Sequence, residues 1–86
     1  MATTPHAGSS TDICAQMRHD AELGKKELRD ERKKLSELKL KLNHETNPIK
    51  AQQLREEIEE LENRIELDEA QLQVQLEDIA ANCSGH

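Results

Sequence analysis

Two cysteines and two histidines near the ends of this chain have the side chains that zinc sites use. Cys14 and His19 lie near its start, and Cys83 and His86 lie at its end. Structural zinc needs four converging ligands, but residues five apart on a helix point to different sides. No metal site is therefore expected. Cys14 and Cys83 form a candidate disulfide if folding brings the two ends together, although a reducing compartment would keep both as thiols.

Two carboxylates, Glu31 and Asp68, interrupt otherwise apolar stripes and could be read as an acid/base pair. Such chemistry also needs a pocket and a nucleophile. The chain has no Phe, Tyr or Trp, and aromatic side chains supply much of the wall of most ligand pockets. We therefore expect no enzyme activity, no catalytic residues and no cofactor. Polar residues inside a helical stripe more often fix register or oligomeric state.

A basic cluster could contact phosphates; it consists of Arg29, Arg32, Lys33 and Lys34. Acidic residues surround the cluster, and no aromatic residue is available to stack on a base. The formal net charge of -6 also repels nucleic acid as a whole. A nucleic-acid-associated regulatory protein is therefore the alternative function, and docking of the cluster on an acidic helix is favoured.

The elements that position these residues are expected to be long helices, because the composition is typical of them. Charged residues make up 35 % of the 86 residues and hydrophobic residues 34 %, as in coiled coils. A chain this short buries little surface alone, so association is expected. Neither a signal-peptide pattern nor an apolar run of membrane-spanning length is visible. We expect a cytoplasmic protein with no membrane partner.

An all-α helical hairpin is predicted, because Asn47 and Pro48 form an N-cap followed by proline at the first helical position. The alternative is one continuous helix with a kink at Pro48. The predicted division is a disordered tail over residues 1–10, a hairpin over 11–82 (helix 11–43, turn 44–47, helix 48–82) and a loose tail over 83–86.

Apolar or small residues recur at alternating spacings of three and four in both halves of the chain, the pattern of an antiparallel coiled-coil seam. The predicted pairs are Leu38 with Leu54, Leu35 with Ile58, Leu28 with Ile65, and Ala21 with Leu72. The other seam residues are Met17, Leu42, Leu61, Leu76 and Ile79. Residues 18–41 contain nine Lys or Arg against six Asp or Glu, and residues 49–80 contain three against ten. These opposite charges favour the hairpin and its orientation.

Further apolar residues fall outside this seam, namely Leu23, Leu67, Val74 and Ala81. A two-helix hairpin needs one stripe per helix, so the extra residues face water or a partner. Scattered surface leucines are the plain alternative. We interpret them as an association face and predict a non-enzymatic protein-protein interaction module: an adaptor, small chaperone or assembly subunit. Its expected partner is a second copy, as a homodimer forming a helical bundle, or an amphipathic helix of another protein.

Overall fold

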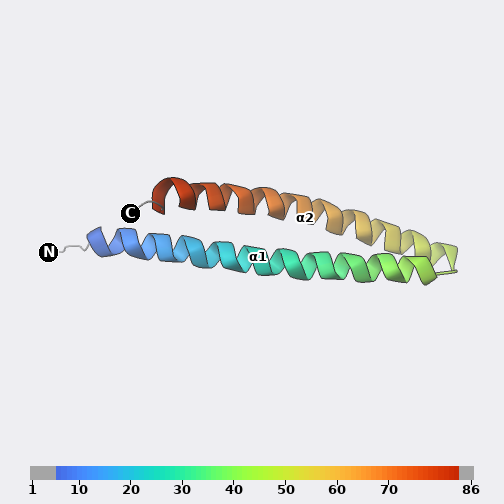
Figure 1. The fold of residues 1–86 in the computed structure, drawn as a ribbon. Helices are drawn as coiled ribbons and strands as arrows, with labels where there is room; N and C mark the ends of the chain where they lie inside the picture. The colour runs from blue at the N-terminus through green and yellow to red at the C-terminus, as the bar shows by residue number, and fades with distance from the viewer. Residues whose placement is uncertain (1–5, 84–86) are drawn as a thin grey trace.

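Two long antiparallel helices make up the computed structural model, which describes residues 6–83 and, for side chains, residues 13–83. Helix α1 spans His6–His44 and α2 spans Pro48–Cys83, and the two pack side by side along their length (Figure 1). The molecule is a rod of 67 × 28 × 15 Å. The predicted all-α helical hairpin is confirmed. Neither described helix contains an apolar stretch suited to crossing a lipid bilayer.

The helix boundaries differ from the predicted ones at the start of α1. This helix begins at His6 rather than at Thr11, so residues 6–10 of the predicted tail are helical. Extending a nucleated helix adds a hydrogen bond for each residue fixed, whereas the prediction stopped at the first capping residue. Helix α2 runs one residue beyond the predicted end, to Cys83. The remainder of the predicted tails, residues 1–5 and 84–86, lies outside the described residues.

A short turn over residues 45–47 connects the helices, and Asn47 caps α2 as predicted. The Asn47 Oδ1 atom accepts hydrogen bonds from the backbone N–H groups of Ile49 at 2.9 Å and Lys50 at 3.2 Å. These are amide groups that the first turn of a helix leaves without an internal partner. Pro48 is the first residue of α2 and has no N–H to satisfy. The local sequence therefore fixes where the chain reverses.

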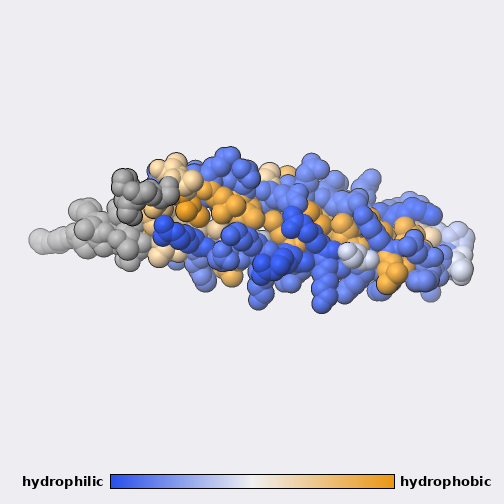
Figure 2. All heavy atoms as spheres, viewed as in Figure 1, coloured by the Kyte–Doolittle hydropathy of each residue, from blue (hydrophilic) through white to orange (hydrophobic). Residues whose placement is uncertain are grey.

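The core is a single seam between the helices. Three apolar residues of α1 and three of α2 are buried: Ala21, Leu28, Leu38, Ala51, Ile58 and Ile65. The remaining predicted seam residues are half-buried, apart from Leu76: Met17, Leu35, Leu42, Leu54, Leu61, Leu72 and Ile79. Figure 2 shows hydrophobic residues gathered between the helices and hydrophilic residues over the outer surface. No described side chain reaches complete burial, so the core is thin.

Two apolar residues lie outside the seam, although their hydropathy suggested that they would be buried in it. Leu76 is 37 % exposed, and the neighbouring Gln75 is half-buried in its place. Ile49, which begins the apolar pattern of the second half of the chain, is 70 % exposed, and the buried position near the turn belongs to Ala51. The heptad phase of α2 runs unbroken from Ala51 to Ile79, and one helix cannot change phase for single residues. Leu76, which was predicted to lie in the seam, therefore lies at the surface.

The register of the two helices also differs from the predicted pairing. A Cβ atom placed on Gly24 would lie 3.6 Å from Leu72 Cδ1, whereas Ala21 was the predicted partner of Leu72. The shift is three residues, or about one helical turn. The predicted pairing assumed that the helices separate symmetrically around residues 45 and 46. The observed turn spans residues 45–47 and is centred where it was predicted, so the displacement of the contacting layers arises within the packed helices.

Candidate protein-interaction surface

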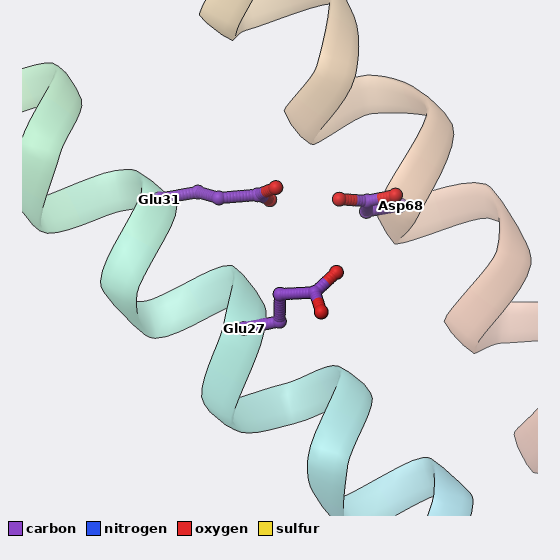
Figure 3. A group of neighbouring side chains, drawn as sticks. All are labelled: Glu27, Glu31 and Asp68. Atoms are coloured by element: carbon purple, nitrogen blue, oxygen red, sulfur yellow. The ribbon is translucent and has the colours of Figure 1, made fainter.

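A cluster of three carboxylates lies within the seam, midway along the hairpin. Glu27 and Glu31 of α1 and Asp68 of α2 point toward one another (Figure 3), with one carboxylate oxygen of each within 4.8 Å of the others. The Oε1 atom of Glu31 is buried and has no hydrogen-bond partner. Glu31 and Asp68 are half-buried, and Glu27 is exposed. The register shift brings the two seam carboxylates together, which the predicted pairing did not.

Burial raises the pKa of Glu31 from 4.5 to about 7, and four further effects accompany it. A hydrogen bond to Asp68 and the negative charges of Asp68 and Glu27 also raise this pKa, while the positive charge of Arg64 lowers it. Two carboxylates this close share a proton more easily than they both ionise. The chemistry that the cluster supports as it stands is proton sharing between the helices.

Interhelical ion pairs line one side of the hairpin, which we call the Arg32 side. Its residues around Leu72 are Lys25, Arg29, Arg32, Glu69, Gln73 and Leu76. Arg32 donates to the Glu69 carboxylate, and Lys39 Nζ lies 3.4 Å from Glu62 Oε2 on the same side. One member of the basic cluster is thus paired within the protein. This pairing is the docking of α1 cations on the acidic helix that the charge pattern indicated.

Apolar side chains are exposed on the opposite side of the hairpin, near its open end. A shallow groove there contains Asp20, Leu23, Glu27 and Gln71 around Leu72. Leu67 and Val74 precede and follow Gln71 by four and three residues, spacings that put side chains on one helix face. We call this surface the Leu67 face: Asp20, Leu23, Glu27, Leu67, Gln71, Val74 and Asp78. The predicted association residues therefore lie on a common side of the rod.

The apolar residues of the Leu67 face are well exposed. Leu67 is 71 % exposed, Val74 55 % and Leu23 53 %. Ala81 is also exposed and lies seven residues beyond Val74, which extends the stripe toward the open end. An isolated hairpin gains nothing from these side chains, because they lie outside its seam. Exposed apolar residues in a group are a feature of interaction surfaces, whereas single ones are common on any protein.

The charge of the Leu67 face is negative. Asp20, Glu27 and Asp78 are exposed, and none makes an ion pair among the side chains described. Neither Lys nor Arg lines the groove beside Leu23 or the adjoining groove formed by Met17, Asp20, Gln75 and Asp78. Cations begin only nearer the turn, where Lys34 and Arg64 line the next groove. The face therefore combines apolar side chains with unpaired carboxylates.

A second exposed apolar area near the turn was not predicted as a site. Leu40 and Ile49 are 59 % and 70 % exposed, and a groove beside Leu40 also contains Leu54, Lys41 and Lys50. These residues carried little signal in the sequence, since Leu40 fits no stripe and Ile49 stands at the start of the apolar pattern of the second half of the chain. The lining of this groove also includes Glu45 and Glu57, so it contains charges of both signs, in contrast to the Leu67 face.

The open end is closed by a disulfide between Cys14 and Cys83, whose Cα atoms are 5.8 Å apart. The terminal guanidinium of Arg18 also donates to the Cys83 carbonyl oxygen at 3.3 Å. Sulfur atoms bonded to each other are not available as thiolate ligands, and His19 is exposed. His86 lies outside the described residues.

Comparison of this chain with protein-family models, with curated proteins and with solved structures found no match.

Proposed function

We propose that this protein is a non-enzymatic interaction module that binds another helical element on its Leu67 face. The observation that carries the proposal is the exposure of Leu23, Leu67 and Val74 together on one side of a hairpin whose seam does not use them. Burial of apolar surface contributes about 25 cal/mol for each Å². A partner that covers these three side chains would therefore form a complex stabilised by their burial, because the hairpin alone leaves them exposed to water.

Two kinds of partner fit a long amphipathic face. A second copy would give a homodimer with four helices in a bundle, and an amphipathic helix of another protein would lie in the groove. Both would use helix packing at the open half of the rod. Such a module would act as an adaptor, small chaperone or assembly subunit. Each of these roles can be served by a rigid rod with a binding surface on one side.

Solution mass tests the proposal first. Light scattering of the oxidised chain, over a wide concentration range, would be compared for the wild type and for Leu67→Glu/Val74→Glu. A matched control is Leu40→Glu/Ile49→Glu, which places the same charges on similarly exposed residues near the turn. A dimer that only the first variant dissociates supports association through the Leu67 face. A dimer that only the control dissociates contradicts it.

The nucleic-acid alternative has less support. Arg32 of the basic cluster is paired with Glu69, and Arg29 lies on that same side with Lys25. A cytoplasmic location also stays a prediction. The Cys14–Cys83 disulfide weighs against it, because disulfides persist mainly in oxidising compartments.

A further inference from the structure

We infer that the partner of the Leu67 face is a basic amphipathic helix of a different chain, with an apolar stripe flanked by Lys or Arg. This inference rests on the proposed function and specifies the partner's chemistry. It follows from the placement of charge around the apolar side chains, and it distinguishes between the two kinds of partner that apolar exposure alone allows.

Carboxylates flank the apolar residues at both ends of the groove. Asp20 and Asp78 line its part nearest the open end, beside Gln75, and Glu27 and Asp68 line its part toward the middle of the rod. Glu31 adds a further carboxyl group within 4.8 Å of Glu27 and Asp68. A helix with leucines along its centre and cations on both flanks would place positive charge on each of these groups.

A second copy of the chain would bring negative charges, rather than positive ones, to these carboxylates. A symmetric dimer uses the same surface on both chains, related by a two-fold axis. If this axis passes through the apolar residues between the two acidic groups, Asp20 and Asp78 of one copy approach Glu27 and Asp68 of the other. Like charges brought together at an interface oppose association. The Leu67 face therefore attracts a basic helix and repels a second copy of itself.

Neither Lys nor Arg lines the two grooves that contain these carboxylates. The ion pairs that the structure contains outside single turns of helix join Arg32 to Glu69 and Lys39 to Glu62 on the opposite side, within the described residues. Arg64 approaches the Glu31 end of the cluster and marks the limit of the acidic surface. The grooves without Lys or Arg are thus in the half of the rod that also exposes Leu67 and Val74.

Peptide binding to the full, oxidised chain tests the inference. The probe is a designed three-heptad helical peptide with leucines in its apolar stripe and lysines beside them, labelled for fluorescence anisotropy. A twin peptide has glutamates in place of the lysines. The lysine peptide is expected to bind at least about tenfold more tightly than its twin, with an affinity that falls as salt screens the charges. Equal binding of the two peptides overturns the inference.

Two matched variants separate a specific site from the negative charge of the whole chain. Asp20→Asn/Glu27→Gln/Asp78→Asn removes three carboxylates from the Leu67 face. Glu59→Gln/Glu66→Gln/Glu77→Gln removes three exposed carboxylates from elsewhere on α2. The first is expected to weaken binding of the lysine peptide about tenfold, because three ion pairs with the peptide are lost, and the second about twofold or less. Equal losses overturn the inference.

Apolar variants distinguish failure of this inference from failure of the proposed function. Leu67→Ser/Val74→Ser should weaken binding of the lysine peptide, and Leu40→Ser/Ile49→Ser should leave it unchanged, with circular dichroism confirming that both stay folded. A wild-type homodimer dissociated by Leu67→Glu/Val74→Glu would support the proposed function but overturn the basic-helix partner. If neither self-association nor peptide binding responds to Leu67 and Val74, both fail.

Discussion

Glu31 of α1 and Asp68 of α2 approach across the seam until their carboxylate oxygens lie within 4.8 Å. Both occupy positions that a hydrophobic residue would take in a regular heptad. The apolar layers on either side of them, including the buried Leu28 and Ile65, hold the two groups together. The hairpin therefore contains one layer whose stability depends on a proton.

Glu31→Gln should make the stability of the hairpin less dependent on pH. The pKa of Glu31 is raised from 4.5 to about 7 in the folded state, so the folded protein binds this proton more tightly than the unfolded one. The stabilisation is complete below pH 4.5 and is lost as the pH rises to about 7. At this partly solvated site the effect is on the order of 1 kcal/mol after screening.

Urea unfolding followed by circular dichroism at pH 5 and pH 8 measures this effect. The wild type should lose more stability between these values than Glu31→Gln does. Glu59→Gln, a change at an exposed glutamate, should retain the wild-type difference. If Glu31→Gln and the wild type show the same pH dependence, the two carboxyl groups do not share a proton.

The heptad pattern predicted most of the seam because periodicity is a property of many residues together. Leu28, Leu38 and Ile65 are buried as expected, while Leu76 was misplaced because its own hydropathy was weighed above the phase of its helix. The turn is centred where it was predicted, but a shift of the register by one turn of helix leaves the apolar pattern almost unchanged. The meeting of Glu31 and Asp68 could therefore not be predicted, although both interruptions were visible.

Asn47→Ala should destabilise the hairpin by about 1 kcal/mol, because it removes the acceptor of two backbone N–H groups in the first turn of α2. Thermal unfolding by circular dichroism would measure the loss. Asn47→Asp retains an acceptor at this position and should stay close to the wild type. Equal losses in the two variants would mean that the side chain acts by something other than capping.

Gly24→Ala should stabilise the hairpin by about 0.5–1 kcal/mol, since alanine is the better helix former. A Cβ atom at this position would lie 3.5 Å from Gln75 Oε1 and 3.6 Å from Leu72 Cδ1, which are ordinary contact distances. Gly24→Leu should instead force the helices apart and destabilise by about 1–3 kcal/mol. Urea unfolding of both variants gives the comparison, and a loss of stability in Gly24→Ala would show that α2 approaches more closely than these distances indicate.

Reduction of the Cys14–Cys83 disulfide should lower the free energy of unfolding by about 4 kcal/mol on the chain-entropy estimate, and by less if the open end retains order when unfolded. The cysteines are 69 residues apart, so the crosslink restrains almost the whole unfolded chain. Unfolding curves with and without dithiothreitol measure the difference. Cys14→Ser/Cys83→Ser should resemble the reduced wild type and be insensitive to dithiothreitol. The prediction is wrong if the oxidised wild type is no more stable than this variant. In that case the crosslink would raise the free energy of the folded and unfolded states equally, and the turn and seam alone would set the stability.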